Sequence, residues 1–479
     1  MFSILKKAGI LTTALVCAGA CLYLLWNSGA LLPLWADWGA GEYRDASGNY
    51  RIKLNRRAVT VSFREKDIWR SPESVKVQTA LSCDIDRDGG DELILLCWKK
   101  GRYGKDKPFW VDEDEKGWSQ HLFVYEYEEE EIRPKWMSSY IGQDVADMKP
   151  DNLVSDIRHL WLMGPDGKIS SYVWGSWGFV REDTEISFLV LGDNLIHEPI
   201  FRYGLQKEGN FDFLFENFRD LIADSDVAVI NQETPLTDNP SWYGGYPRFG
   251  TPVGVGESIV NAGFDAVTCA TNHALDRGEA GVDFTRHFFT SRGVKCLGIQ
   301  SEDEKEEIPY ETLIRKGVCF ALFNYTYGTN GIRLPDDYPH MVHVLSDEAK
   351  VREDIERAKK KADMVIIFVH WGTEYAKQAD EFQQKWAQIF LESGVDVVVG
   401  THPHEIQPFE VLKDRYGHEM LVYYSIGNFV SAQPEKSCTR GGMARFTISL
   451  GRDGYGISEY DLHPLTISWE KGGKYVTEW

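Results

Sequence analysis

The chain has 479 residues, which predicts two or three domains. Hydrophobic residues make up 43% and charged residues 26%, which is ordinary for a globular protein and excludes a disordered or collagen-like chain. The 52 basic and 73 acidic residues give a net charge of −21, and this argues against a nucleic-acid partner because phosphate backbones require compensating cations.

Residues 1–41 contain an apolar segment that predicts a transmembrane helix. No charge occurs from Ala8 to Trp26, and a helix of that length would extend about 28 Å, close to the thickness of a bilayer core. Lys6 and Lys7 would keep the N-terminus cytoplasmic, so we expect a single-pass protein of the cell membrane with its main domains extracellular. The alternative is cleavage near Ala18, or lipid attachment at Cys21.

Residues 42–184 have few helical patterns and many short aromatic strands, which predicts a β-rich domain. Phe123, Tyr125 and Tyr127 alternate with Leu122, Val124 and Glu126, so each set would share one face of a strand. Eight cysteines are too few for a disulfide scaffold in a chain of this length. Cys83 and Cys97 would either pair across neighbouring strands or stay isolated as small hydrophobic residues, the commoner case.

An acidic loop within this domain has the composition of a calcium site. Oxygen ligands at alternate positions and a glycine at the sharp turn are what calcium requires, although no preceding helix or twelfth-position glutamate makes it an EF-hand. The loop resembles those of FG-GAP and VCBS-type repeats, and the alternative is a solvated acidic turn. The candidate ligands are Asp84, Asp86, Asp88, Asp91 and Glu92.

From residue 185 to residue 470, apolar strands alternate with helical stretches, and residues 471–479 are expected to form a tail. Continuous β-branched runs between helices indicate an α/β domain whose sheet is buried on both faces. We expect helices at 211–223, 279–292, 347–361 and 379–393.

Five of these strands end in side chains that bind metal ions. In such sheets, ligands bind beyond the carboxyl ends of the strands. A set of carboxylates, an amide and imidazoles without cysteine suits Mn²⁺, Fe, Zn²⁺ or Mg²⁺. His402 and His404 stand two apart in a segment expected to be extended, which would project both rings to the same side. The candidate ligands are Asp193, Glu233, Asn272, His370, His402 and His404.

Six short motifs in this order resemble the bacterial capsule-synthesis CapA family, which is associated with poly-γ-glutamate. They are GD at 192–193, NQETPL at 231–236, TNHALDRG at 271–278, HWGTEY at 370–375, GTHPHEIQPFE at 400–410 and YSIGNF at 424–429. The resemblance implies a calcineurin-like metallophosphoesterase fold, a four-layer α/β/β/α sandwich around two metal ions.

The resemblance also implies roles for the ligands. Asp193 and His404 would bind the first metal ion, and Glu233 would bridge the two. The second ion would be bound by Asn272, His370 and His402, and a hydroxide shared by both ions would attack an ester or amide.

His273 would be the general acid or would stabilise the transition state. Asp276 would either orient the imidazole of His273 or cap the helix that begins near Glu279. Further residues that would contact substrate or complete the rim of the pocket are Arg248, Glu374 and Asn428.

The chain departs from the family pattern at two positions. Leu195 stands where the phosphoesterase pattern has a histidine ligand, and His197 is at the wrong offset to replace it. Gln232 stands where the family more often has an apolar residue, which would affect packing rather than chemistry.

We therefore expect an extracellular CapA-like protein that synthesises or exports an anionic capsular polymer and works beside membrane-bound capsule synthesis proteins. The alternative is a non-catalytic accessory protein with a vestigial metal site, which the leucine at position 195 favours.

Overall fold

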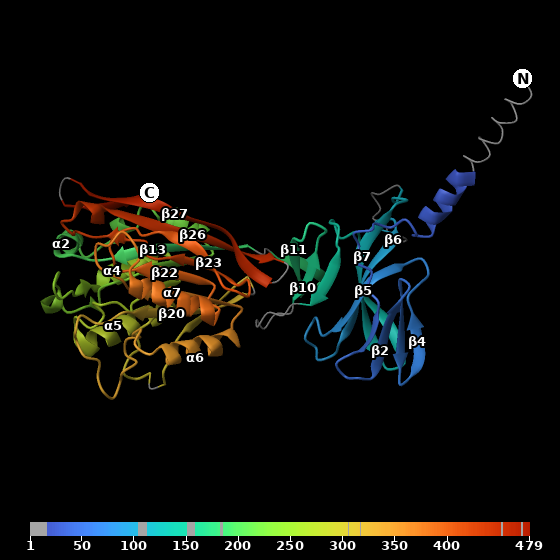
Figure 1. Cartoon of the computed structure of the whole chain (residues 1–479), viewed down its shortest axis with the longest axis horizontal. Helices are drawn as coiled ribbons and strands as arrows, with labels where there is room; N and C mark the ends of the chain where they lie inside the picture. The colour runs from blue at the N-terminus through green and yellow to red at the C-terminus, as the bar shows by residue number, and fades with distance from the viewer. Residues whose placement is uncertain are drawn as a thin grey trace, which may run out of the picture. The chain divides into compact units, whose positions relative to one another are not determined.

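The computed structural model describes residues 17–103, 113–150, 159–182, 185–304, 306–316, 318–451, 454–470 and 473–479. The chain divides into two compact units, an N-terminal unit formed mainly by residues up to 183 and a C-terminal unit formed mainly by 184–449 and 454–479 (Figure 1).

The expected membrane anchor begins at residues that lie outside the described ones. Residues 17–27, which include its second half, are helical. Across the described part of the chain, no helix combines the length and apolar character that a membrane crossing requires.

The N-terminal unit is built from three antiparallel sheets of four strands each, which confirms the expected β-rich composition. Their strand orders are β1-β2-β3-β4, β5-β6-β7-β8 and β12-β11-β10-β9. The strands are β1 (Gly41–Arg44), β2 (Tyr50–Asn55), β3 (Ala58–Phe63), β4 (Lys66–Arg70), β5 (Lys76–Cys83), β6 (Glu92–Lys100), β7 (Trp118–Glu128), β8 (Glu131–Met137), β9 (Asp147–Pro150), β10 (His159–Met163), β11 (Ile169–Gly175) and β12 (Gly178–Glu182).

Strand β7 is buried on both faces because each face meets a different sheet. Phe123 and Tyr125 pack in one cluster with residues of β2 and β3. Leu122 and Val124 pack in another with residues of β10. The predicted division of this strand into two faces is confirmed. The register places Cys83 opposite Glu92 and Cys97 opposite Val77, at opposite ends of the β5–β6 ladder, which does not allow a cross-strand disulfide.

The C-terminal unit contains two large sheets, each centred on parallel strands. One has the order β18-β17-β14-β13-β26-β27-β28 with β25 also paired to β13, and the other has the order β19-β20-β21-β22-β24-β23. The first contains β13 (Glu185–Asn194), β14 (Val227–Asn231), β17 (Ala266–Thr268), β18 (Lys295–Leu297), β25 (Asn428–Val430), β26 (Arg440–Gly451), β27 (Gly454–Trp469) and β28 (Tyr475–Glu478). The second contains β19 (Glu311–Arg315), β20 (Val318–Thr326), β21 (Met364–His370), β22 (Val397–Thr401), β23 (Phe409–Lys413) and β24 (Glu419–Tyr423). A short pair, β15 (Leu236–Thr237) and β16 (Thr251–Pro252), lies beside them.

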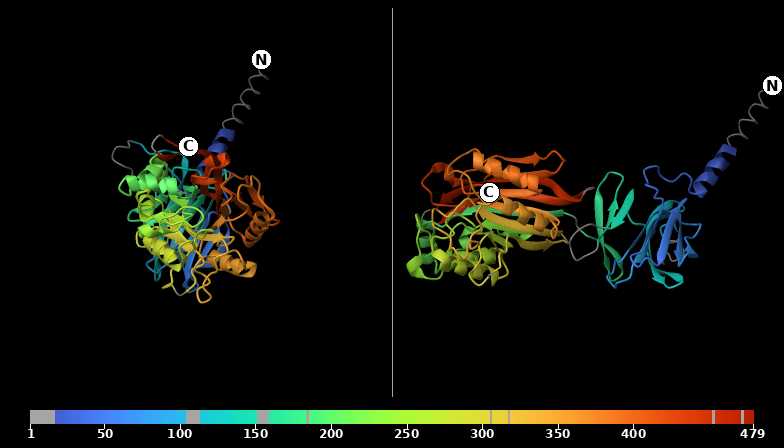
Figure 2. Two further views of the ribbon diagram at one scale, coloured as in Figure 1. Left: turned by 90° about the vertical axis from the view of Figure 1, so that its left-hand side faces the viewer. Right: turned by 60° about the horizontal axis from the view of Figure 1, so that its bottom comes forward.

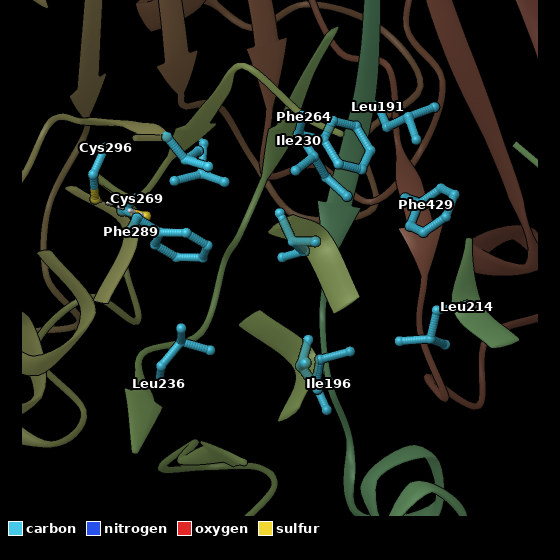
Figure 3. Close-up of a cluster of buried hydrophobic side chains, with 14 of the residues drawn as sticks. Leu191, Ile196, Leu214, Ile230, Leu236, Phe264, Cys269, Phe289, Cys296 and Phe429 are labelled. Atoms are coloured by element: carbon cyan, nitrogen blue, oxygen red, sulfur yellow. Dashed lines mark hydrogen bonds between the residues drawn. The ribbon is translucent and has the colours of Figure 1, made fainter. Parts of the chain in front are cut away.

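The sheets and helices of this unit are arranged in layers (Figure 2), and three hydrophobic clusters lie between these layers. Phe188 and Val229 of the first sheet pack against Phe320 and Ile366 of the second. The opposite face of the first sheet packs against helices. Figure 3 shows side chains of the hydrophobic cluster between them. The opposite face of the second sheet packs against α6 (Glu348–Lys359) and α7 (Glu381–Ser393). The unit therefore has an α/β fold with the layer order α/β/β/α.

Three of the four expected helices are present with small changes at their ends, namely α5 (Gly278–Thr290), α6 and α7. The expected helix at 211–223 is wrong. A 3₁₀ turn, η2 (Asp212–Leu214), and the short helix α3 (Arg219–Asp224) occupy this range, because Phe211, Phe215 and Phe218 are all buried in one core and aromatic residues have low helix propensity. The other helices within the described residues of this unit are α2 (Glu198–Gln206), α4 (Val253–Ala262), η3 (Pro240–Trp242) and η4 (Lys436–Thr439). The expected tail includes β28, which pairs with β27.

Candidate metal centre

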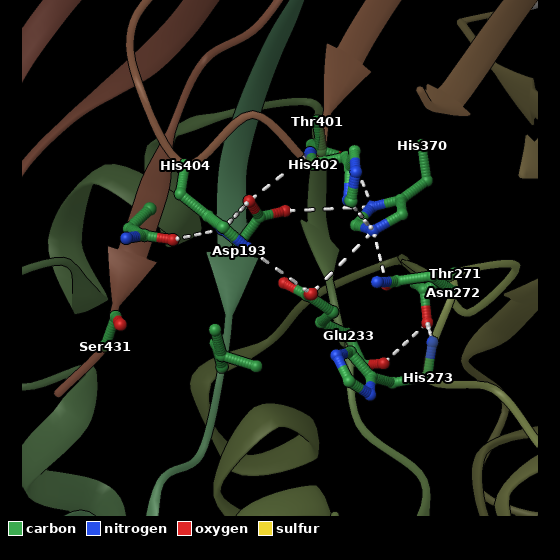
Figure 4. A network of polar contacts seen from close by, with 12 residues as sticks. Asp193, Glu233, Thr271, Asn272, His273, His370, Thr401, His402, His404 and Ser431 are labelled. Carbon is green, nitrogen blue, oxygen red and sulfur yellow. Dashed lines mark hydrogen bonds and ion pairs between the residues drawn. The ribbon is translucent and has the colours of Figure 1, made fainter. Parts of the chain in front are cut away.

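The six predicted metal ligands lie together where the parallel strands of both sheets end (Figure 4). Asp193 is next to last in β13, and His370 is the last residue of β21. The others follow the ends of β14, β17 and β22. All six are buried. The two sheets pack face to face, so their strand ends bring residues from distant parts of the sequence into one site.

Asp193 is held by side chains from two other segments. Its Oδ2 lies 3.0 Å from Nδ1 of His404, and its Oδ1 accepts a hydrogen bond from Nδ2 of Asn231 at 2.7 Å. Nδ1 of His404 also lies 3.0 Å from Oδ1 of Asn428. Asn428 therefore helps to orient an imidazole of the site.

Several atoms with lone pairs converge on Nε2 of His370. Oδ1 of Asn272 lies 3.0 Å from it, Nδ1 of His402 lies 3.2 Å away, and Oε1 of Glu233 lies 3.7 Å away. The other nitrogen, Nδ1, lies 3.0 Å from Oγ1 of Thr401, which fixes the orientation of the ring. A cation is the natural partner for such a group of donor atoms.

The carboxylate of Glu233 is the strongest sign that the site binds a cation. Both of its oxygens are buried, and neither has a hydrogen-bond partner among the described residues. Burial, and then the nearby Asp193, raise the pKa of Glu233 well above its usual range. Buried polar groups in proteins are normally satisfied, and one carboxylate oxygen of Glu233, one of Asp193 and a nitrogen of His404 lie within 4.8 Å of one another. These residues fit a divalent metal ion.

The three imidazoles differ in their proton affinity. Burial and the neighbouring imidazoles lower the pKa of His370 and of His402 well below the usual range, so both rings are neutral as metal ligands must be. Burial also acts to lower the pKa of His404, but Glu233 and Asp193 outweigh it and raise the value to about 9. A divalent cation in this site would replace that proton.

The sequence predicted that the segment carrying His402 and His404 would be extended. The structure shows that this prediction is wrong. Both residues have positive φ angles, 98° and 58°, in the left-handed region that non-glycine residues rarely adopt. Such strained backbone is typical of functional sites. The two ring centroids are nevertheless only 5.9 Å apart.

His273 lies beside this group and is bound to Asp276. Nδ1 of His273 is 2.8 Å from Oδ2 of Asp276, and the same oxygen accepts a hydrogen bond from the backbone nitrogen of Phe249 at 2.7 Å. The N-cap of α5 is Arg277, so Asp276 does not cap this helix. Asp276 can therefore fix the tautomer of His273.

Arg248 and Glu374 are exposed. Nη2 of Arg277 donates a hydrogen bond to the backbone oxygen of Arg248 at 2.9 Å, which supports the loop from which Arg248 projects. A carboxylate oxygen of Glu374 lies within 4.8 Å of a nitrogen of His402 and of His404.

The two departures from the family pattern have different consequences. Leu195 is buried and has no atom that binds a metal ion. His197 is the N-cap residue of α2, and its Nδ1 lies 3.3 Å from the backbone nitrogen of Ala432. Oε1 of Gln232 accepts a buried hydrogen bond from Nδ2 of Asn194 at 2.7 Å.

The acidic loop of the N-terminal unit brings together three of its five candidate ligands. Oxygens of Asp84, Asp86 and Glu92 lie within 4.8 Å of one another. Asp88 instead accepts a hydrogen bond from the backbone nitrogen of Gly90, and Asp91 accepts one from that of Ala46. The ammonium of Lys135 lies 2.5 Å from Asp86 and 2.7 Å from Glu92, so it already supplies positive charge there.

Sequence reasoning missed Asn231, Thr401 and Lys135. Asn231 and Thr401 each stand at the end of a strand within a family motif, and this position could have identified them. Lys135 is on β8, far along the chain from the acidic loop, and no local pattern connects the two.

Comparisons with known proteins place this site within a family. The family described as "Bacterial capsule synthesis protein PGA_cap" matches residues 187–433. The PGA biosynthesis protein CapA of Bacillus subtilis is 25% identical over 59% of this chain and 73% of its own length, and the capsule biosynthesis protein CapA of Bacillus anthracis is 25% identical over 62% and 71%.

Two solved structures resemble the chain at lower identity. The calcineurin-like phosphoesterase YfkN of Bacillus subtilis is 14% identical over 59% of this chain and 90% of its own, with a TM-score of 0.35. The NAD nucleotidase of Haemophilus influenzae is 14% identical over 61% of this chain and 59% of its own, with a TM-score of 0.40. The family match extends over more than half of the sequence and includes every candidate ligand of the metal centre. The chain belongs to the PGA_cap family of bacterial capsule synthesis proteins.

Proposed function

We propose that this protein is a membrane-anchored extracellular hydrolase or transferase that acts in the synthesis or export of an anionic capsular polymer. Family membership supports a role in capsule formation, and the name of the Bacillus subtilis relative favours poly-γ-glutamate as the polymer. The N-terminal apolar segment would attach the protein to the cytoplasmic membrane, where membrane-bound capsule synthesis proteins would be its partners.

The buried carboxylate of Glu233, which has no hydrogen-bond partner among the described residues, carries the proposal of a metal-dependent centre. Asp193 and His404 lie on one side of it, and Asn272, His370 and His402 lie on the other. Divalent metal ions in such sites polarise an ester or amide and activate water at neutral pH, and Mn²⁺, Fe²⁺, Zn²⁺ and Mg²⁺ all suit this ligand set. The calcineurin-like metallophosphoesterase fold that the family resemblance implies would also suit this chemistry.

His273 would transfer a proton to the leaving group. Because Nδ1 is hydrogen-bonded to Asp276, Nε2 is the nitrogen that remains to exchange a proton with substrate. Asp276 in turn holds the ring in place through its second contact with Phe249.

The substrate would be one end of an anionic chain. The exposed guanidinium of Arg248 is the cation that would contact an anionic group of the substrate. The net charge of −21 would repel a long polyanion, which favours local contact with a chain end over binding along the polymer.

A second candidate function is a non-catalytic accessory role in a capsule assembly complex. The observation that favours it is Leu195, which leaves the first metal position one histidine short of the phosphoesterase pattern.

Metal analysis and turnover of the purified full chain separate the two functions. We expect bound Mn²⁺ or Zn²⁺ and metal-dependent hydrolysis of an aryl phosphodiester or a γ-glutamyl amide, with both lost in His402→Ala. His287→Ala, which removes an exposed imidazole of α5, serves as the matched control and should keep both. Metal-free protein that still restores capsule formation in a deletion strain would favour the accessory role.

A further inference from the structure

Among the described residues, three buried side chains form the group expected at the first metal position, namely Asp193, Glu233 and His404. We propose that Glu374 is a fourth ligand, which compensates for the histidine that Leu195 replaces. This inference rests on the proposed function, because it assumes that the centre binds metal ions.

Glu374 lies at the open side of the centre with its carboxylate directed toward the imidazoles. One of its oxygens, a nitrogen of His402 and a nitrogen of His404 all lie within 4.8 Å of one another. His404 also belongs to the group formed with Asp193 and Glu233, so the two groups of donor atoms share this imidazole. The carboxylates of Asp193, Glu233 and Glu374 therefore all lie near the imidazole of His404.

The turn that carries Glu374 is fastened to the segment that carries the imidazoles. The backbone nitrogen of Tyr375 donates a hydrogen bond to the oxygen of Pro403 at 2.8 Å. Nε2 of Gln407 donates to the backbone oxygen of Ala376 at 2.9 Å. These contacts on both sides of His404 hold the backbone of the turn that carries Glu374 beside the imidazoles, as the positioning of a metal ligand requires.

The carboxylate of Glu374 forms no hydrogen bond or ion pair with any described residue. Its charge nevertheless contributes to raising the pKa of Glu233 and of His404. An exposed glutamate beside two other carboxylates raises the local negative charge, and a divalent cation is the partner that would compensate it.

Replacement of an imidazole by a carboxylate also changes which metal ions the site prefers. Carboxylate oxygens favour harder cations such as Mn²⁺ and Mg²⁺, whereas imidazole favours Zn²⁺. The proposal therefore predicts that Glu374 contributes more to the binding of Mn²⁺ than to the binding of Zn²⁺.

The test is equilibrium dialysis of the full chain against Mn²⁺ and, separately, Zn²⁺, followed by elemental analysis. Glu374→Gln keeps the size of the side chain and removes its charge. We expect this variant to lose one of two bound Mn²⁺ ions, or to bind the weaker ion about tenfold or more less tightly, with a smaller loss for Zn²⁺. Glu374→Ala should behave in the same way. Glu257→Gln, which alters an exposed glutamate of α4, should match the wild type.

Unchanged Mn²⁺ stoichiometry and affinity in both Glu374 variants would overturn the inference. If only KM for substrate changed, Glu374 would be a substrate contact instead. If His402→Ala lost metal while Glu374→Gln kept it, the metal centre of the proposed function would stand without this ligand. Wild-type protein that binds no metal ion would overturn both proposals.

Discussion

The backbone of Gly192 approaches Gly427 so closely that a Cβ atom at position 192 would overlap the carbonyl oxygen of Gly427. The same oxygen accepts a hydrogen bond from the backbone nitrogen of Asp193 at 3.1 Å. Each glycine precedes a residue that contacts His404, namely Asp193 and Asn428. The contact between the glycines therefore sets the position of two residues of the metal centre.

Gly192→Ala should separate these two segments and weaken metal binding. We expect a loss of about 1–3 kcal/mol in the free energy of unfolding, as is typical of overpacked interiors, together with weaker Mn²⁺ binding. Urea unfolding and equilibrium dialysis measure the two effects. Gly456→Ala is the control, because its Cβ would have no atom within 4 Å and should change neither quantity. Wild-type stability in Gly192→Ala would show that the segments can move apart without cost.

Glu233→Gln should stabilise the protein without metal and abolish its response to metal. The substitution removes a buried ionisable group that lies near Asp193 and whose two oxygens have no hydrogen-bond partner among the described residues, and leaving such a group unsatisfied costs about 1–3 kcal/mol. The metal-free variant should therefore melt at a higher temperature than the metal-free wild type. Mn²⁺ should raise the melting temperature of the wild type but not of the variant, and calorimetry measures both. A metal-free variant that melts below the wild type would contradict this account.

The convergence of the metal ligands was predictable because parallel strands end at the same edge of a sheet. Asp193, His370 and the His402–His404 segment each follow a continuous apolar run, and this pattern alone predicts their common site. The alternation of such strands with helices predicted an α/β domain with a sheet buried on both faces, and the family resemblance implied the α/β/β/α layer order of the C-terminal unit.

Features that depend on the placement of individual side chains or on local strain were not predictable. No periodicity reveals that Asn231 donates to Asp193, or that His402 and His404 adopt positive φ angles. The prediction of a helix at 211–223 was wrong for a related reason. Its phenylalanines are placed by the tertiary core, which overrides the local helical pattern.

Acid should destabilise the C-terminal unit through His343. This imidazole is buried with Nε2 3.3 Å from Oε1 of Gln300, and burial, followed by the charge of Arg286, lowers its pKa to about 4. Of the other charged groups near it, Lys350 and His340 also lower the pKa and Asp354 raises it.

The unfolded chain takes up this proton at about pH 6.5. The stability that is present above that value is therefore lost as the pH falls toward 4. We expect the free energy of unfolding to fall by about 2 kcal/mol between pH 7 and pH 5 from this residue alone. In His343→Gln the fall should be smaller by that amount, as urea unfolding at the two pH values would measure. His287→Gln, at an exposed imidazole, should retain the wild-type slope.

Lys135→Gln should destabilise the N-terminal unit and increase its affinity for calcium. The Lys135 ammonium contacts Asp86, Glu92 and Glu126, and the side chain of Glu92 is only 3% exposed. Loss of one partner of a buried ion pair costs about 3 kcal/mol or more, so the unit should unfold at lower temperature. In this variant, no ammonium group competes with a calcium ion for the carboxylates.

Calcium should therefore restore much of the lost thermal stability and bind at least about tenfold more tightly than in the wild type, as calorimetric titration measures. Lys66→Gln is the matched control, because Lys66 is exposed and lies 3.7 Å from the exposed Glu130. If calcium bound both Lys135→Gln and the wild type equally, the ammonium would not occupy the position of the ion. If calcium bound neither, Asp84, Asp86 and Glu92 would form an acidic turn that Lys135 alone neutralises, and the calcium hypothesis for this loop would be wrong.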